Sequence, residues 1–339
     1  MSAGHDLPSA SHDGASAFDV LSDVLRAVRL TGALLFLVDA ATPWHSWAPR
    51  SDAFRRLVLP GCAHMVSYHV LTEGRCWAGL SNGEPCAVEA GDVLIVAHGE
   101  AYYLAAPVDA PPSYGPREAL DFFRDMAAGV MPSAVAEGGS GAKTRFICGF
   151  LGCDREPFNP VLSALPPLTV VRGSRAGDRM APLVEFAVRA LREPRGAGQD
   201  GVLLRLAELM FVEVLRRHLD ALPAARTGWL AGLRDPLVAR ALQRLHGAPA
   251  QAWTLESLAD ATGASRTVLA ERFAHVVGLP AMTYLTRWRM QLASRLLADG
   301  DAKVLAVATA VGYESEAAFS RAFKKAAGVA PALWRRRGA

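Results

Sequence analysis

The sequence has little of the chemistry that would place the protein outside the cell or in a membrane. Its five cysteines are Cys62, Cys76, Cys86, Cys148 and Cys153. This odd set has no CxxC pair and lies in a chain far longer than disulfide-stapled scaffolds, which favours reduced thiols in a cytoplasmic protein. The longest clean apolar run, ALLFLV at 33–38, stops at Asp39, well short of the roughly 20 residues that span a bilayer. We therefore expect no membrane partner.

The N-terminal segment also does not have the pattern of a signal peptide. Residues 1–20 read MSAGHDLPSASHDGASAFDV, with no basic segment followed by an apolar core, so the pattern is not that of a signal peptide. We expect residues 1–16 to form a flexible polar tail.

Positive charge is concentrated in the C-terminal third of the chain. The formal net charge is only +3. Residues 235–339 contain 14 Lys and Arg against 8 Asp and Glu, whereas residues 1–234 contain 22 against 25. A basic segment beside a slightly acidic remainder indicates a polyanionic partner for the C-terminal part.

The first half of the chain alternates short apolar runs with turn residues. Residues 18–30 carry apolar side chains at helical spacing and end near Gly32, which predicts one helix. From 33 to 106, runs such as HMVSYHVL and DVLIVA are separated by Gly, Pro, Asn and Asp, a pattern typical of a small antiparallel sandwich or barrel. Residues 107–143 read as a connector with a short helix near 117–128, and KTRFICGFLGC at 143–153 resumes as a strand.

Helical periodicity begins near residue 178. The segment GVLLRLAELMFVEVLRRHL at 201–219 has a wide apolar stripe. A stripe of that width is compatible with packing between domains, with packing between two subunits, and with burial in an ordinary core. We expect 173–232 to form a helical linker or dimerisation region.

The C-terminal part contains a two-fold repeat. Residues 254–284 read TLESLADATGASRTVLAERFAHVVGLPAMTY, and residues 303–334 read KVLAVATAVGYESEAAFSRAFKKAAGVAPALW. Gly263 aligns with Gly312 at an offset of 49, and Phe273 with Phe323 at an offset of 50. Each copy predicts a short helix, a turn with glycine, and a second helix with an i, i+4 apolar pair. Helix, tight turn and helix form the DNA-binding supersecondary unit.

The second helix of each copy pairs its apolar face with a face of small, polar and basic residues. Ser265 and Ser315 precede these helices as N-caps. The candidate DNA-binding residues on the outer faces are Arg266, Thr267, Ala270 and Glu271 in the first copy, and Glu316, Ala317, Ser320, Arg321, Lys324 and Lys325 in the second. Small residues let a helix enter a groove, and we expect Arg321 to hydrogen-bond the edge of guanine. Lys324 and Lys325 follow one turn later, where phosphates run.

A single helix is predicted between the copies, with Pro280 at its start and Gly300 at its end. Residues 281–298 would span about 27 Å at 1.5 Å per residue, and successive major-groove faces repeat about every 34 Å. A rod of that length can present both second helices to one side of a duplex.

Several segments resemble a known family. WTLESLADATGASRTVLAERFAHVVG, YLTRWRMQLASRLL and VATAVGYESEAAFSRAFKKAAGVAPALWR resemble the C-terminal domain of AraC-type transcription regulators, over about 235–337. YHVLTEG, EAGDVLIVAHGE and ALPPL are similar to pieces of the cupin-like sensor domain of one branch of that family. The resemblance implies a cytoplasmic, often dimeric regulator that binds promoter DNA.

The resemblance also implies an α+β chain in four parts. After the tail at 1–16, we expect an antiparallel β cupin-like sensor barrel at 17–172 and the helical linker at 173–232. An all-α AraC-type DNA-binding domain with two helix-turn-helix units is expected at 233–339.

A cupin barrel can bind a metal, a small organic ligand, or nothing. On a straight strand His69 and Glu73 share a face that His64 does not. Metal-binding cupins usually carry two histidines separated by one residue and a later histidine, and that first pair is missing here. We expect no metal and no cofactor. The candidate effector-binding residues are His69, Glu73, Trp77, His98 and Tyr102.

Cysteines and aromatic side chains leave two further possibilities for the sensor. Cys148 and Cys153 are five apart on a predicted strand and face opposite ways unless a glycine bends it, so redox sensing by this pair requires such a bend. The second possibility is that aromatic side chains line a pocket for an apolar or aromatic ligand. Packing in the core is the commoner role of aromatic residues. The candidate lining residues of such a pocket are Trp44, Trp47, Tyr68, Trp77, Tyr102 and Tyr103.

These patterns favour a sequence-specific transcription regulator that is not an enzyme. Its expected partners are double-stranded promoter DNA and a second copy of the chain, with a small-molecule effector and RNA polymerase as further candidates. A cupin-type metal-dependent enzyme with an appended helical domain is the alternative, although no nucleophile set or complete metal triad is visible. A protein-interaction module is a third hypothesis, which steep salt dependence of duplex binding would exclude.

Overall fold

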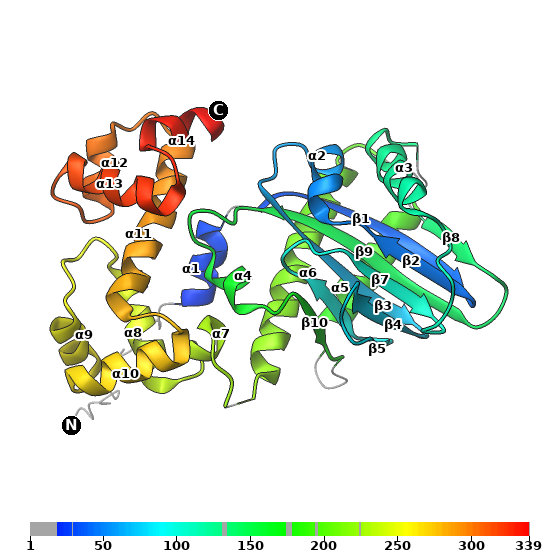
Figure 1. Cartoon of the computed structure of the whole chain (residues 1–339), viewed down its shortest axis with the longest axis horizontal. Coiled ribbons are helices and arrows are strands. Elements are labelled where there is room, and N and C mark those ends of the chain that lie inside the picture. The colour runs from blue at the N-terminus through cyan, green and yellow to red at the C-terminus, as the bar shows by residue number, and fades with distance from the viewer. Residues whose placement is uncertain are drawn as a thin grey trace, which may run out of the picture.

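A computed structural model describes residues 19–28, 30–130, 134–173, 178–193, 196–223 and 225–338. The expected tail at 1–16 lies outside these ranges. Figure 1 shows a β-rich half and a helical half, with α1 (Val20–Ala27) and α4 (Pro160–Ala164) between them. None of the described helices is both long and apolar enough to cross a bilayer.

The described strands form two sheets that face each other as a sandwich. The larger sheet has the order β10-β6-β3-β9-β1-β8, and the smaller has the order β2-β7-β4-β5. The strands are β1 (Leu30–Ala41), β2 (Trp44–Ala48), β3 (His64–Glu73), β4 (Arg75–Leu80), β5 (Cys86–Glu89), β6 (Val93–Val96), β7 (Tyr102–Ala106), β8 (Ala134–Gly138), β9 (Lys143–Cys153) and β10 (Leu168–Val171).

The sandwich differs in two details from the antiparallel barrel that the sequence predicts. β8 runs parallel to β1, whereas the other paired strands run antiparallel. Among the described residues the two sheets do not close into a barrel, because the edge strands of the larger sheet pair with neither edge strand of the smaller one. The α+β class and the order of a β sensor half before a helical half are as expected.

Strand alternation gives the larger sheet two apolar faces. Along β1, Phe36 and Val38 lie in the core between the sheets, whereas Leu35 and Leu37 lie in the core on the opposite face. This separation follows from the two-residue period of a strand. The second face is covered by α5 (Met180–Arg192) and α6 (Gln199–Ala221). Part of the wide apolar stripe of α6 therefore belongs to an interior core.

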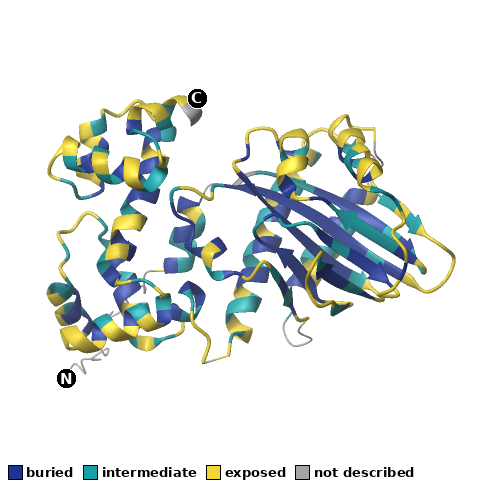
Figure 2. Cartoon of the chain, viewed as in Figure 1, coloured by how far each residue is buried: buried dark blue, intermediate teal, exposed yellow. Residues whose placement is uncertain are grey.

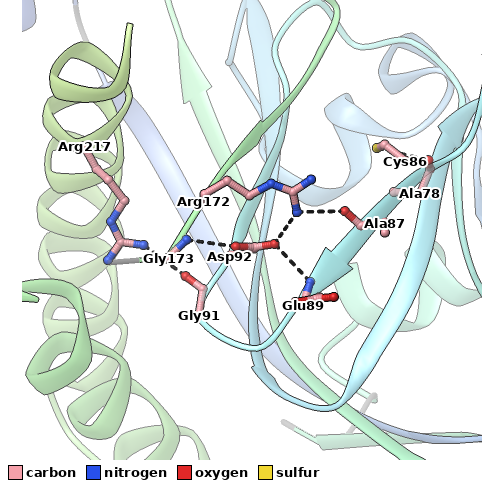
Figure 3. A network of polar contacts seen from close by, with 9 residues as sticks. All are labelled: Ala78, Cys86, Ala87, Glu89, Gly91, Asp92, Arg172, Gly173 and Arg217. Carbon is pink, nitrogen blue, oxygen red and sulfur yellow. Dashed lines mark hydrogen bonds and ion pairs between the residues drawn. The ribbon is translucent and has the colours of Figure 1, made fainter. Parts of the chain in front are cut away.

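A polar network fastens the turn before β6 to both sheets and to α6. The buried carboxylate of Asp92 accepts hydrogen bonds from the backbone N–H groups of Glu89 (3.0 Å) and Gly173 (2.8 Å) and from the guanidinium of Arg172 (2.7 Å). Arg217 on α6 donates a hydrogen bond to the carbonyl oxygen of Gly91 at 3.0 Å (Figure 3). A buried charge is tolerated here because its oxygens are hydrogen-bonded and paired.

Helices cover the ends of the sandwich and form the C-terminal half. A 3-10 turn at Ser51–Ala53, α2 (Arg55–Val58) and α3 (Pro116–Ala127) belong to the β-rich half. The helices of the C-terminal half are α7 (Trp229–Gly232), α8 (Pro236–Gly247), α9 (Leu255–Thr262), α10 (Arg266–Val277), α11 (Ala281–Ala298), α12 (Val304–Ala310), α13 (Glu316–Ala327) and α14 (Pro331–Gly338). The helix expected at 18–30 is shorter, because β1 begins at Leu30.

The two C-terminal helix pairs have different cores. Phe273 of α10 and Tyr284 of α11 belong to one apolar cluster with Phe211 of α6 and Val24 of α1. Phe323 of α13 belongs instead to a separate cluster, to which α11 contributes Met290, Ala293 and Leu297. The first pair is therefore packed onto the sensor half, whereas the second is attached through the far end of α11.

Buried polar contacts also join the halves. His246 of α8 lies 2.7 Å from the carboxylate of Asp23 on α1. The side-chain amide of Gln291 on α11 donates to the carbonyl of Ala27 (3.2 Å) and accepts from the backbone N–H of Phe158 (3.1 Å). Because Gln291 is buried, these bonds satisfy groups that water does not reach. They fix the middle of α11 against α1 and the loop before α4.

Candidate nucleic-acid interface and sensor cavity

The first helix pair, α9 and α10, is positioned by side-chain caps and a glycine turn. Thr254 caps α9 by accepting a hydrogen bond from the N–H of Ser257 at 3.0 Å. Gly263 ends α9 with a φ of 69°, a left-handed conformation that glycine adopts at little steric cost. Ser265 caps α10 by accepting from the N–H of Val268 at 3.3 Å. The structure thus confirms Ser265 as the N-cap that the sequence predicts in this copy.

The second pair, α12 and α13, repeats the glycine turn and the side-chain cap on its second helix, whereas α12 has no side-chain cap. Ser315 accepts a hydrogen bond from the N–H of Ala318 at 3.2 Å and caps α13. Gly312 has a φ of 81°, and a Cβ added there would lie 2.5 Å from the carbonyl oxygen of Ala250. Phe323 is fully buried. The turn of this pair therefore lies against the loop between α8 and α9, and Phe323 anchors α13 in its own core.

The outer faces of α10 and α13 are open to solvent (Figure 2). Ala270 and Ser320 are half-buried. The other candidates are exposed, namely Arg266, Thr267, Glu271, Glu316, Ala317, Arg321, Lys324 and Lys325. Within the described ranges, no ion pair or side-chain hydrogen bond engages Arg266, Arg321, Lys324 or Lys325. Their donors are available to an external partner.

Other basic side chains of this region have structural partners. Arg272 pairs with Asp235 at 2.7 Å. Arg289 donates to the carbonyl oxygens of Pro249 and Gln251, both at 2.7 Å. Part of the positive charge counted in the sequence therefore stabilises the helical fold.

The helix α11 separates the two pairs. Its 18 residues span about 27 Å at 1.5 Å per residue. Figure 1 shows α9 and α10 at one end of α11 and α12 and α13 at the other, with both pairs away from the sheets.

A cavity lies between the two sheets beside α3. Its free volume is about 50 Å³, enough for one or two water molecules and less than a benzene ring needs. The described lining residues are Phe36, Val38, Ser46, Trp47, Ala48, His69, Tyr102, Leu104, Tyr114, Ala119, Phe122, Phe123, Glu137, Phe146, Cys148 and Phe150.

His69 is at the centre of one polar group in this cavity. Its ring nitrogens lie 3.0 Å from Sγ of Cys148 and 2.7 Å from the hydroxyl of Tyr102. Complete burial lowers the pKa of His69 to about 3, because the cation would lose its hydration. Burial likewise raises the pKa of both Cys148 and Tyr102. All three groups are therefore uncharged at neutral pH.

Glu137 is at the centre of a second polar group. It lies on β8, two residues after Val135, which packs against the core between the sheets. Its carboxylate accepts a hydrogen bond from the hydroxyl of Ser46. Burial raises the pKa of Glu137, and the bond from Ser46 opposes part of that rise. Burial raises the pKa of the neighbouring Tyr114, and the charge of Glu137 adds to that rise.

Two of the five candidate effector-binding residues meet in the cavity, and the others lie elsewhere. His69 and Tyr102 are in contact. The ring of His98 instead lies 2.9 Å from the carbonyl oxygen of Leu165. Trp77 is half-buried on β4 and is not among the described residues that line the cavity.

Glu73 is exposed and pairs with Arg145 at 2.6 Å. The expected shared face with His69 fails because the pairing of β3 with β9 shifts register after Leu71. Glu137 and Ser46 were missed by the sequence analysis. Glu137 is two residues after Val135, so the two would share a face if the segment were a strand. The sequence of this segment reads as a connector, which hides that pattern.

Cys148 and Cys153 lie in two different cores. Cys148 lies in the core between the sheets and Cys153 in the core under the helices, so the pair faces opposite ways as the strand period requires. All five cysteines are free. In the ranges that the structure describes, no group of three or more His, Cys, Asp and Glu is placed to hold a metal ion.

One aromatic candidate points away from the cavity. Tyr68 lies in the core under the helices, and its hydroxyl donates to the carbonyl oxygen of Ala207 on α6 at 3.4 Å.

Comparison with known proteins gives matches to both halves. Residues 19–220 match the family described as "Cupin", and residues 258–337 match the family described as "Helix-turn-helix domain". A protein of Streptomyces lividans described as an AraC-like transcription regulator is 33% identical over 94% of this chain and 98% of its own length. The HTH-type transcriptional regulator AlkR of Acinetobacter baylyi is 27% identical over 91% of this chain and 95% of its own length.

A solved structure is similar to part of the chain. The C-terminal domain of AraT, a response regulator from Geobacillus stearothermophilus, is 36% identical and covers 30% of this chain and 85% of that chain, with a TM-score of 0.30.

Proposed function

The chain belongs to the AraC-like transcription regulators, and from this premise we propose which residues read DNA and how the sensor half controls them. The chain is a DNA-binding regulator with an N-terminal ligand-sensing domain. The observation that carries the residue assignment is the pair of capped helices with exposed, unpaired basic side chains. The boundaries of its four parts, 1–16, 17–172, 173–232 and 233–339, stay a prediction.

On α13, Arg321 is the proposed base reader. Its guanidinium is exposed, and a guanidinium can donate two hydrogen bonds to the N7 and O6 acceptors of guanine. The small neighbours Ala317 and Ser320 let the helix approach the floor of the groove. Lys324 and Lys325 follow at the end of α13 and are assigned to phosphates.

On α10, the proposed reading face consists of Arg266, Thr267, Ala270 and Glu271. Arg266 occupies the first position of the helix, where side chains reach base edges in helix-turn-helix complexes. Glu271 can accept a hydrogen bond from the amino group of cytosine. With α11 as a spacer of about 27 Å, the two helices would enter successive major grooves about 34 Å apart on one side of the duplex.

The sensor half is proposed to bind a small effector in the cavity between the sheets. Binding there would shift the packing of the larger sheet against α6 and α1, which share a core with the first helix pair. RNA polymerase is a proposed further partner. We also assign the chain to the cytoplasm and give it no catalytic role.

A homodimer is the proposed assembly. Three large apolar side chains are exposed on α5 and α6, namely Phe186 (47%), Val202 (46%) and Leu209 (47%). Burying them against a second copy would remove apolar area from water. Sedimentation of the purified chain and of Leu209→Glu tests this assignment, which requires a dimer that the substitution dissociates.

The DNA assignments are tested by selecting duplexes from a random pool and measuring variants on the selected site. Arg321→Ala should cost about 1–3 kcal/mol and relax preference at one base pair. Lys325→Ala should weaken binding to all DNA sequences alike. It should also reduce by about one the magnitude of the slope of log affinity against log salt concentration.

Lys143→Ala is the matched control, since Lys143 is an exposed basic residue on β9 of the sensor half. It should leave DNA affinity and its salt dependence unchanged. Equal losses of DNA affinity for Arg321→Ala and Lys325→Ala on every sequence would contradict the assignment of Arg321 to bases and Lys325 to phosphates. DNA binding that does not weaken with salt would instead favour a protein-interaction module.

A further inference from the structure

The carboxylate of Glu137 faces the core between the sheets at a position where strand alternation calls for an apolar residue. Val135, on the same face of β8, packs against that core, and Ala40, the partner of Glu137 on β1, is buried in it. The hydroxyl of Ser46 donates to the carboxylate. One hydroxyl leaves most of the acceptor capacity of a carboxylate unused.

Two carboxylates with little exposed side-chain area, those of Asp92 and Asp235, have an arginine beside them. Asp92 pairs with Arg172 at 2.7 Å, and Asp235 pairs with Arg272 at 2.7 Å. No Lys or Arg is among the described residues that line the cavity of Glu137. The imidazole of His69 is uncharged there, since burial lowers its pKa to about 3. The carboxylate therefore lacks a cationic partner within the described lining.

Half of the described residues that line the cavity are Phe, Tyr or Trp. The rings belong to Phe36, Trp47, Tyr102, Tyr114, Phe122, Phe123, Phe146 and Phe150. The faces of such rings attract a cation within about 6 Å of the ring centroid. Aromatic walls with one acidic group are complementary to a positively charged ligand with an apolar body, and they disfavour an anion.

We propose that this cavity binds a small organic cation, such as a protonated amine on an aromatic or alkyl body, with its charge beside Glu137. The proposal deepens the effector function proposed above and rests on it. The ammonium group donates hydrogen bonds to the carboxylate of Glu137, and the apolar body lies among the rings. The neutral pair of His69 and Tyr102 offers hydrogen bonds to a second polar group of the ligand.

The free volume of about 50 Å³ means that a ring-sized ligand enters only when a wall moves. α3 supplies Ala119, Phe122 and Phe123 to the wall. Phe122 is only half-buried, and Figure 1 shows α3 at the edge of the sandwich, near β8. The proposed opening is therefore a displacement of Phe122.

The test is calorimetric titration of the purified full-length protein with three compounds of similar shape at neutral pH. Benzylamine is the cationic probe, benzyl alcohol the neutral one and benzoate the anionic one. Benzylamine should bind tightest and benzoate weakest. Glu137→Gln, which removes the charge and keeps the shape, should weaken benzylamine binding by at least about tenfold. Its affinity for benzyl alcohol should be retained, which shows that the variant is folded.

Two further variants make the test decisive. Phe122→Ala should bind benzylamine more tightly than the original chain, because the ring no longer has to be displaced. Glu84→Gln removes an exposed carboxylate from the turn after β4 and should change neither titration nor DNA binding. DNA binding of the original chain is measured in parallel, because its absence would overturn the regulator function rather than the cation class.

Three results would overturn the proposal. The first is benzoate or benzyl alcohol binding as tightly as benzylamine. The second is unchanged benzylamine affinity in Glu137→Gln. The third is no benzylamine binding at about 1 mM to either the original chain or Phe122→Ala.

Discussion

Acid should destabilise the sensor half through His69. An unfolded histidine has a pKa of about 6.5, whereas burial lowers the pKa of His69 in the folded chain to about 3. As the pH falls below 6.5, the unfolded state takes up a proton that the folded state refuses, so the free energy of unfolding decreases. Stability from this group is thus fully present above the unfolded pKa and is lost as the pH falls toward 3.

The size of the effect follows from linkage. At pH 5 nearly all unfolded chains carry the proton and almost no folded ones do, so moving from pH 7 to pH 5 should remove about 2 kcal/mol of unfolding free energy. A folded pKa one unit higher would hardly change this figure, because pH 5 still lies above it. Two titratable side chains contact His69, namely Tyr102 and Cys148. Burial raises the pKa of each, so both stay uncharged between pH 7 and pH 5.

Glu137 acts in the opposite direction. Its pKa is raised in the folded chain, so the folded state binds a proton more readily than the unfolded one and acid removes less stability. Comparison with His69→Gln cancels this contribution, because Glu137 is present in both proteins.

The assay is urea unfolding followed by fluorescence and circular dichroism at pH 7 and pH 5, for the original chain and for His69→Gln. Between pH 7 and pH 5 the free energy of unfolding of the original chain should fall by about 2 kcal/mol more than that of the variant. Equal losses would refute the reasoning, since they would mean that the folded protein accommodates a protonated His69.

Three further substitutions probe the helical half. Gly312→Ala should lower the unfolding temperature, with a cost of about 1–3 kcal/mol for the left-handed backbone and the clash with Ala250. Gly300→Ala is its control, because a Cβ there meets no atom closer than 3.9 Å. Equal losses of stability for the two variants in urea unfolding would contradict the role given to Gly312. Phe323→Ala should cost about 3–5 kcal/mol and abolish DNA binding in a gel-shift assay, and retained affinity would show that α13 does not depend on this anchor. Gln291→Leu removes two hydrogen bonds between the halves and should cost about 1–3 kcal/mol, seen as faster proteolysis between them, and an unchanged cleavage rate would argue against a coupling role.

The helical half could be predicted well because its signals are local. Thr254, Ser265 and Ser315 stand directly before the helices that they cap. The repeat of Phe273 as Phe323 marks the buried aromatic residue on the second helix of each pair, although the two residues lie in different cores. Such spacing depends on the helical period alone and needs no knowledge of distant contacts.

The cavity could not be predicted in the same way because distant strands assemble it. Glu137 lies on a strand that pairs in parallel with β1, and nothing local signals that pairing. The register shift after Leu71 that separates Glu73 from His69 is likewise a property of two strands together. Gln291 reads as one more polar residue on a helix until α1 and the loop before α4 are packed against it.

The unequal attachment of the two helix pairs gives α11 the mechanical character of a lever. One end is embedded in the core that continues into the sheet, and the other carries a separate small core. A tilt of about 5° at the embedded end would displace the distant end by roughly 2 Å over a length of about 27 Å. A change of that size would shift the second pair relative to the DNA grooves. We therefore expect the preferred spacing between the two contacted grooves to depend on the state of the sensor half.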